Sequence, residues 1–277
     1  MELIPLFLLI IICAALLTGY PVALTLGGIS ILFALICIPF GIFDPTIFGS
    51  IPIRIFGIMN NVTLLAVPLF IFMGTILEKS GIAANMLKNM ALAFRSVKGG
   101  LSISIIVVGA LLAASTGIVG ATVVTMGLMS LPILINQGYD KSFSAGLVAS
   151  TGTLGQIIPP SIALVLLGDV MSNAYQRAQN DMGIFSQQTV TVGDLFIGAI
   201  VPGVLICIGY LIYTIYKNQT SPSINDQTVD SKINIISLFK TLALPFLLIF
   251  LVLGSIFAGI ATPTEAAAIG AFGALIV

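Results

Sequence analysis

Long apolar stretches, separated by short polar or glycine- and proline-rich breaks, dominate this chain. Nine stretches have the character of membrane segments, at 3–18, 22–41, 62–78, 99–115, 118–136, 142–168, 193–216, 236–258 and from 264 onward. A helix needs about 20 consecutive apolar residues to cross a bilayer core. The pattern therefore predicts an all-α polytopic membrane protein.

The segments between these stretches are of two kinds. Residues 44–60 are less apolar and predict an interfacial helix or arm, and residues 80–97 place Met, Leu and Phe against basic residues at helical spacing. That spacing is typical of an amphipathic helix lying at a surface. Residues 169–192 and 217–235 are polar and are expected to be loops.

Composition agrees with the membrane assignment and excludes several functions. Hydrophobic residues make up 58% of the 277 residues and charged residues only 7%, where soluble proteins carry about a quarter. The chain has no histidine and equal numbers of basic and acidic residues, so we expect no nucleic-acid partner. It also lacks a phosphate-binding loop. An enzyme or an ATP-driven pump is therefore not expected, and the three cysteines are interpreted as apolar filler.

The distribution of Lys and Arg predicts the orientation of the segments. Basic residues cluster at 79–98, follow at Lys141 and recur at 217–240, which places these regions in the cytoplasm and the loop at 169–192 outside. These assignments agree only if residues 99–136 enter and leave on the same side. A re-entrant hairpin that turns at "AASTG" and a pair of full spans both satisfy this. We favour the hairpin, because its halves are short and its turn is small and polar.

Two parts of the chain share one pattern, an apolar helix, a Gly/Pro break and a small-residue helix. The breaks are "TGYPVA" at 18–23 and "GIATPTEAAA" at 259–268, and the predicted orientations of the two parts are opposite. This is the beginning of an inverted-topology repeat. The apolar pattern continues to the last residue, so we expect most of a second repeat to be absent from this chain.

The stretch "ASTGTLGQIIPPS" at 149–161 predicts a broken helix inside a membrane segment. Pro159 and Pro160 lack amide hydrogens, and two glycines loosen the turn before them. Backbone groups freed in this way survive at membrane depth only where something polar satisfies them. Carbonyl and hydroxyl oxygens would suit Na⁺, and the helix start after Pro160 would suit an anion.

Simple packing is the alternative for such small residues and proline kinks, because both are common in membrane helices. The combination of the break with a separate polar turn at 115–117 favours a transport site. Glu265, in "TPTE", fits a capping box better than a proton-coupling role.

Several motifs resemble one transporter family. They are "GATVVTMGLMSLPIL" (120–134), "GTLGQIIPPSIALVLLGD" (152–169) and "GIATPTEAAAIGA" (259–271), with "LLAVPLFIFMGTILEKSGIA" (64–83) and "VGDLFIGAIVPG" (192–203) in support. They are similar to the large membrane subunit of tripartite ATP-independent periplasmic (TRAP) transporters. The resemblance implies an elevator-type, Na⁺-driven importer of an organic acid in the bacterial inner membrane. It also implies two partners, a periplasmic substrate-binding protein and a small membrane subunit.

The resemblance carries candidate site residues onto this sequence. It places one Na⁺ between Thr116, Gly117 and the carbonyl of Ile118 on one side and Gly155, Ile157 and Pro160 on the other. The family often has a serine where this chain has Ile118. Candidate substrate contacts are Ser115, Thr151, Thr153 and Ser161, and no cofactor beyond the coupling ion is expected.

The resemblance also divides the chain. Residues 1–98 would form scaffold helices with an interfacial arm, 99–168 half of a transport domain, 169–235 a linking helix and loops, and 236–277 the start of the second repeat. Two other functions remain open. One is a single-component elevator-type Na⁺/anion symporter, and the other is an inactive truncated product or assembly scaffold.

Overall fold

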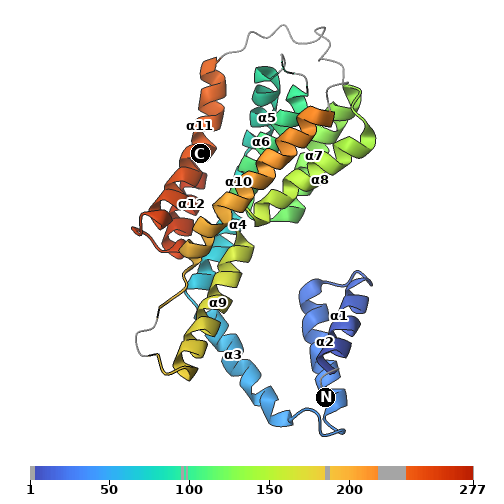
Figure 1. Ribbon diagram of the computed structural model, residues 1–277, viewed down its shortest axis with the longest axis vertical. Helices are drawn as coiled ribbons and strands as arrows, with labels where there is room; N and C mark the ends of the chain where they lie inside the picture. The colour runs from blue at the N-terminus through green and yellow to red at the C-terminus, as the bar shows by residue number, and fades with distance from the viewer. Residues whose placement is uncertain (1–3, 95–96, 98, 185–187, 218–234, 277) are drawn as a thin grey trace. The chain divides into compact units, whose positions relative to one another are not determined.

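The computed structural model describes residues 4–94, 97, 99–184, 188–217 and 235–276, and these contain helices and no strand (Figure 1). The α-helices are α1 (Ile4–Leu16), α2 (Val22–Cys37), α3 (Ser50–Met59), α4 (Ala66–Lys79), α5 (Ile82–Ala93), α6 (Gly100–Thr116), α7 (Val119–Asn136), α8 (Lys141–Thr153), α9 (Ile162–Asp181), α10 (Val192–Lys217), α11 (Ile235–Phe257) and α12 (Pro263–Ile276). Three 3₁₀ turns accompany them, η1 (Pro45–Gly49), η2 (Thr63–Leu65) and η3 (Leu154–Gln156).

Each predicted membrane segment is helical, with 142–168 divided between α8 and α9, and the prediction of a loop from residue 169 onward is wrong. Residues 169–181, expected to be polar loop, continue α9 to Asp181. Side chains along this part donate to oxygens one turn back, as Asn173 Nδ2 does to the Asp169 carbonyl at 2.8 Å. The helix ends where Gly183 takes a positive φ of 70°. Most of the loop at 217–235 lies outside the described residues.

The helix predicted within 80–97 is confirmed as α5, and its position at the membrane surface stays a prediction. Its apolar face, which includes Met86, Leu87 and Met90, is buried in a cluster with α6, while Lys88 is exposed. The apolar side chains of α5 are therefore used for packing on protein. The segment 44–60 is helical as predicted, in η1 and α3.

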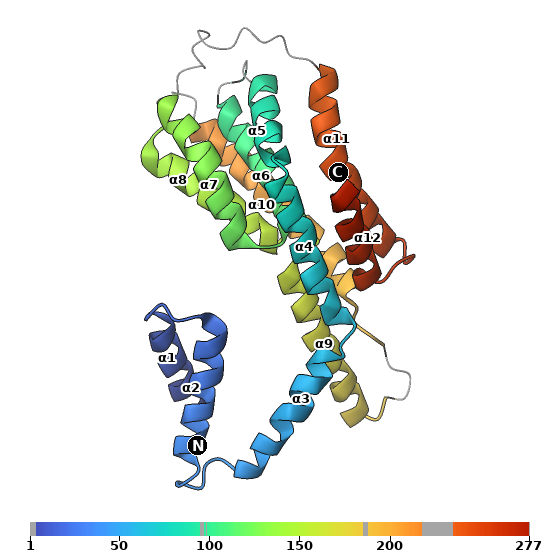
Figure 2. The ribbon, with the colours of Figure 1, turned by 180° about the vertical axis from the view of Figure 1, so that it is seen from behind.

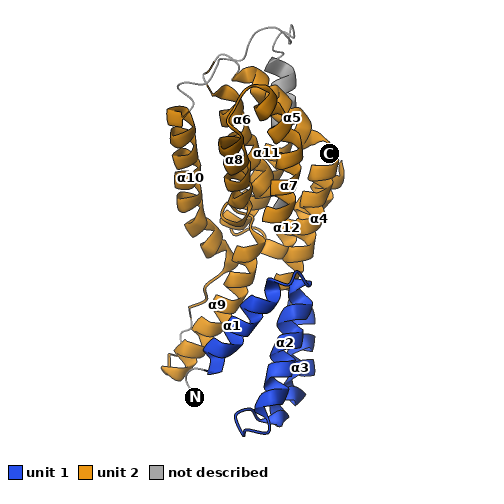
Figure 3. Ribbon diagram, turned by 90° about the vertical axis from the view of Figure 1, so that its right-hand side faces the viewer, with its two compact units in different colours: residues 1–61 blue, residues 62–277 orange. Residues whose placement is uncertain are grey.

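The chain divides into two compact units, residues 1–61 and 62–277 (Figure 3). In the first unit, α1 packs against α2 and α3 against η1. Large apolar side chains of this unit are widely exposed, for example Phe7 (64%) and Leu24 (73%). The predicted scaffold and transport parts are defined by which helices move during transport. The two compact units do not test that division, and it stays a prediction.

The second unit holds two buried clusters. In one, α4 packs closely against α12. Only glycine fits at position 270 of this contact without displacing Met73, since an added Cβ would lie 2.7 Å from Met73 Sδ. In the other, α5, α6, α7 and α8 pack together, as both faces of the ribbon show (Figures 1 and 2). The candidate site lies where α6, α7 and α8 meet.

The surface of the second unit is also rich in exposed apolar side chains. On α10, Val201, Leu205, Ile212 and Tyr216 are each more than half exposed. By length and composition, α7 and α10 can each cross a bilayer, and a third span results when residues 45–79 are counted together. Fold and surface together define an all-α membrane protein. Whether α6 and α7 form a re-entrant hairpin or two full spans stays a prediction, because α7 is long enough to cross a bilayer.

The two Gly/Pro breaks of the predicted repeat share a left-handed glycine and a proline at the start of the following helix. Gly19 after α1 and Gly259 after α11 both take positive φ angles, 83° and 68°. Pro21 then precedes α2, and Pro263 begins α12. The helix–turn–helix pattern of both parts is therefore confirmed, and their opposite orientation stays a prediction.

Candidate functional site

The helices α6 and α7 are joined by a two-residue turn. Gly117 ends α6 in the left-handed region, with φ +61°, and its amide donates to the Ala113 carbonyl at 3.1 Å. Ile118 is extended, and α7 begins at Val119. A residue with a Cβ would be strained at position 117, so glycine permits this tight tip.

The predicted break between α8 and α9 is confirmed. After α8 the chain makes the 3₁₀ turn η3, passes through a cis peptide bond between Pro159 and Pro160, and resumes as α9 at Ile162. Ser161 is the N-cap of α9, and its hydroxyl accepts from the Leu164 amide at 3.4 Å. The same hydroxyl donates to the Gln156 carbonyl at 2.7 Å, which holds the two sides of the break together.

The hairpin tip and the helix break pack directly on each other. A Cβ added to Gly155 would lie 3.3 Å from the Ala113 carbonyl oxygen, and one added to Gly117 would lie 3.4 Å from the Pro160 carbonyl oxygen. Backbone therefore meets backbone at both points. Gly117 and Pro160, which the family resemblance assigned to opposite sides of an ion site, therefore lie close together, and the rest of that ligand set stays a prediction.

Gln156 joins the two segments and was missed by the sequence analysis. Its side-chain Nε2 donates to the Gly117 carbonyl oxygen at 3.1 Å, across 39 residues of chain. Its backbone carbonyl meanwhile accepts from Ser161. The polar character of Gln156 inside an apolar stretch was the available signal.

Three carbonyl oxygens of the break, those of Gly155, Ile157 and Pro160, accept no hydrogen bond from the described residues. Neither 113–118 nor 149–162 contains a charged side chain. Neutral, hard oxygen ligands fit a monovalent cation such as Na⁺, whereas divalent cations are usually held by carboxylates.

Small residues dock the broken helix into the hairpin. A Cβ on Gly109 of α6 would lie 2.1 Å from Thr151 Cγ2, and one on Gly152 of α8 would lie 2.3 Å from Val123 Cγ2 of α7. Thr151 is fully buried, and its hydroxyl donates to the Leu147 carbonyl at 2.7 Å. The structure thus gives Thr151 a packing role, and its substrate contact stays a prediction.

The remaining predicted residues differ in exposure. Ser115 is buried and its hydroxyl donates to the Leu112 carbonyl at 2.8 Å, while Thr153 is exposed and donates to the Ser150 carbonyl at 2.7 Å. Ile118 is half-buried and can offer only its backbone, but its carbonyl oxygen already accepts from the Thr122 amide at 3.2 Å and from the Thr122 hydroxyl at 2.9 Å. The side chain of Thr116 lies outside what the structure describes.

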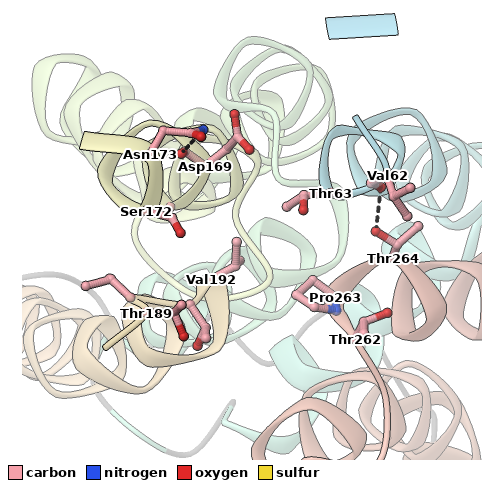
Figure 4. Close-up of a pocket in the computed structure, with 13 residues that line it drawn as sticks. Val62, Thr63, Asp169, Ser172, Asn173, Thr189, Val192, Thr262, Pro263 and Thr264 are labelled. Carbon is pink, nitrogen blue, oxygen red and sulfur yellow. Dashed lines mark hydrogen bonds between the residues drawn. The ribbon is translucent and has the colours of Figure 1, made fainter. Parts of the chain in front are cut away.

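A cavity of about 310 Å³, lined mainly by polar residues, lies between η2, α9, α12 and the start of α10 (Figure 4). Two capping boxes occupy its rim. Thr191 Oγ1 donates to Asp194 Oδ2 at 2.7 Å, and Thr262 Oγ1 donates to Glu265 Oε2 at 2.9 Å. The predicted capping role of Glu265 is confirmed. The hydroxyls of Thr191 and Thr262 both serve as helix caps.

An all-α membrane protein in which a helical hairpin meets a broken helix is the class that fold and site define. The sequence matches the family model described as "Tripartite ATP-independent periplasmic transporter, DctM component" over residues 9–277. The chain belongs to this family.

Curated relatives agree with the family assignment. The large permease protein DctM of a C4-dicarboxylate TRAP transporter from Rhodobacter capsulatus is 31% identical over 94% of this chain and 57% of its own length. Its counterpart from Vibrio cholerae is 32% identical over 95% of this chain and 53% of its own length. An isethionate TRAP permease protein, DctMQ, from Oleidesulfovibrio alaskensis is 31% identical over 83% of this chain and 34% of its own length. The chain spans a third to just over half the length of these relatives.

Proposed function

We propose that this chain acts in the large membrane subunit of a Na⁺-coupled TRAP transporter for an organic acid. The contact between the hairpin tip and the helix break carries this proposal. Gly117 and Pro160, 43 positions apart in sequence, face each other there, with open carbonyls beside them. Backbone breaks at membrane depth are tolerated where they line a polar site.

Sodium is the coupling ion that best fits this site. Its ligands would be Gly155, Ile157 and Pro160 from the break, with Thr116, Gly117 and the carbonyl of Ile118 from the tip. The Ile118 carbonyl would have to give up one of its two hydrogen bonds from Thr122 to serve. No titratable side chain belongs to this set, so proton coupling has no carrier here. The Ser161 cap and the first turn of α9 would orient an anionic substrate toward the break.

A carboxylate is the substrate class that we favour. Two relatives named above are C4-dicarboxylate permease proteins, and others are named for sialic acid and ectoine. We further propose that a periplasmic binding protein delivers the substrate and that a small membrane subunit supports the permease. Membership of the TRAP family supports both partners and a multi-pass position in the bacterial inner membrane.

Uptake by reconstituted proteoliposomes tests the function. The large subunit that contains this chain is reconstituted with its binding protein and small subunit, and uptake of a radiolabelled C4-dicarboxylate is compared under inward Na⁺ and K⁺ gradients. We expect uptake only with Na⁺ and only with the binding protein. Uptake without the binding protein would favour a single-component symporter. No uptake with Na⁺, despite assembly with the partners, would favour an inactive product or scaffold.

A further inference from the structure

A cavity of about 530 Å³ lies between the start of α8 and the end of α10, away from the helix break. Its lining combines charged, aromatic, hydroxyl and apolar side chains. The residues that matter here are Asp140, Phe143, Leu147, Tyr213, Thr214 and Lys217. Volumes of about 300–1,000 Å³ are typical of small-molecule sites.

The cavity has a charged end and an apolar interior. Asp140 directly precedes α8, and Lys217 is the last residue of α10, so both charges lie at helix ends. Three to four residues inward, the rings of Phe143 and Tyr213 lie with centroids 6.4 Å apart. This contact aligns the two helix ends, and Leu147 lies one further turn from the charged end.

Within the described residues, Asp140 and Lys217 are not paired with each other. In the part of the chain that the structure describes, no ion pair joins Asp140 to Lys217, although both line the cavity. One carboxylate oxygen of Asp140 accepts from the Phe143 amide at 2.8 Å, which leaves its other oxygen available. A ligand that carries both a cation and an anion would be complementary to these two charges.

One buried polar group also lacks a partner. Thr214 lines the cavity and is 1% exposed, and its hydroxyl makes no hydrogen bond within the described chain. An unsatisfied buried hydroxyl costs about 1–3 kcal/mol. A ligand oxygen would remove that cost once the Thr214 side chain turned its hydroxyl, which is itself buried, toward the cavity.

We propose that this cavity binds a zwitterionic phospholipid with a primary ammonium headgroup. The phosphate pairs with Lys217, the ammonium with Asp140, and a glycerol ester oxygen accepts from Thr214. An acyl chain then follows the apolar wall at Leu147. A membrane protein meets such lipids throughout its surface, and tyrosine and lysine are typical of the interface where headgroups lie.

Native mass spectrometry of the full chain tests this proposal. The protein is released from nanodiscs that contain equal amounts of phosphatidylethanolamine, phosphatidylcholine and phosphatidylglycerol. We expect phosphatidylethanolamine to be retained at least threefold over the other two. Phosphatidylcholine shares the phosphate but cannot donate from its ammonium, and phosphatidylglycerol has no cation.

Variants locate the bound lipid. Asp140→Asn should remove the preference over phosphatidylglycerol, Lys217→Gln should lower retention of all three lipids, and Thr214→Val should lower retention of phosphatidylethanolamine. Lys88→Gln, an exposed lysine on α5, is the matched control and should change nothing. Equal retention of the three lipids, no retention at all, or equal effects of Lys217→Gln and Lys88→Gln would overturn the proposal. A photoactivatable phosphatidylethanolamine that fails to label 140–150 and 210–217 would overturn it as well.

Discussion

Gln156 Nε2 donates a hydrogen bond to the Gly117 carbonyl oxygen at 3.1 Å, and this bond ties the helix break to the hairpin tip. The bond takes only one of the two lone pairs of that oxygen. The second lone pair can still face a cation. Gln156 is therefore a positioning residue for the proposed ion site.

Removing this bond should weaken Na⁺ binding more than it alters folding. A hydrogen bond of this kind contributes about 1 kcal/mol, so Gln156→Met should raise the Na⁺ concentration for half-maximal uptake by about fivefold. The maximal rate should change little. Gln176→Met on α9, whose side chain bonds Ser172, is the control. An unchanged Na⁺ dependence in Gln156→Met, with the wild type still Na⁺-dependent, would remove Gln156 from the site and leave the proposed function standing.

A larger side chain at position 155 should disrupt the proposed ion site. A Cβ there would lie 3.3 Å from the Ala113 carbonyl oxygen, and a valine would push the break away from the hairpin. We expect Gly155→Val to reduce Na⁺-driven uptake at least tenfold. Gly120→Val on α7, where nothing lies within 4 Å of an added Cβ, should keep most of the activity. Equal uptake by both variants would contradict the close approach at Gly155.

The packing of α6 on α8 permits a rescue experiment. Gly109→Ala places a methyl group 2.1 Å from Thr151 Cγ2, and such overpacking costs about 1–3 kcal/mol. Thermal unfolding in detergent should show a lowered midpoint. Thr151→Ser removes Cγ2 and keeps the hydroxyl that bonds Leu147, so the double variant should recover most of the loss. Additive losses in the double variant would show that the two side chains do not meet.

Glu265 should not couple protons. Its carboxylate accepts from the amide and hydroxyl of Thr262, as a helix cap does. Glu265→Gln should therefore leave the pH profile and the Na⁺ dependence of uptake unchanged, with only a slightly lower thermal midpoint. A shifted pH profile would return Glu265 to a coupling role.

The break and the hairpin tip could be predicted because their signals are local. Two adjacent prolines stop a helix wherever they occur, and Gly117 favours a left-handed turn. The continuation of α9 to Asp181 was missed, because its polar residues were interpreted as loop. The run from 169 to 182 contains no glycine or proline, and that absence was the better indicator of helix.

The contacts made by Gln156 and Thr151 could not be predicted, for a different reason. Gln156 reaches Gly117 across 39 residues, and Thr151 fills the space above Gly109 across 42. A single sequence shows which residues are small or polar, but it does not show the register in which two helices meet. The apolar face of α5 could likewise be identified from the sequence, but its packing against α6 could not.

Hydrogen–deuterium exchange of the backbone at 113–119 and 154–162 tests the central claim most directly. Exchange is compared in Na⁺ and in K⁺ at equal ionic strength, with α10 as the internal reference. If a cation binds between the tip and the break, both segments should exchange several-fold more slowly in Na⁺, and α10 should not change. Identical exchange of both segments in the two salts would contradict the account.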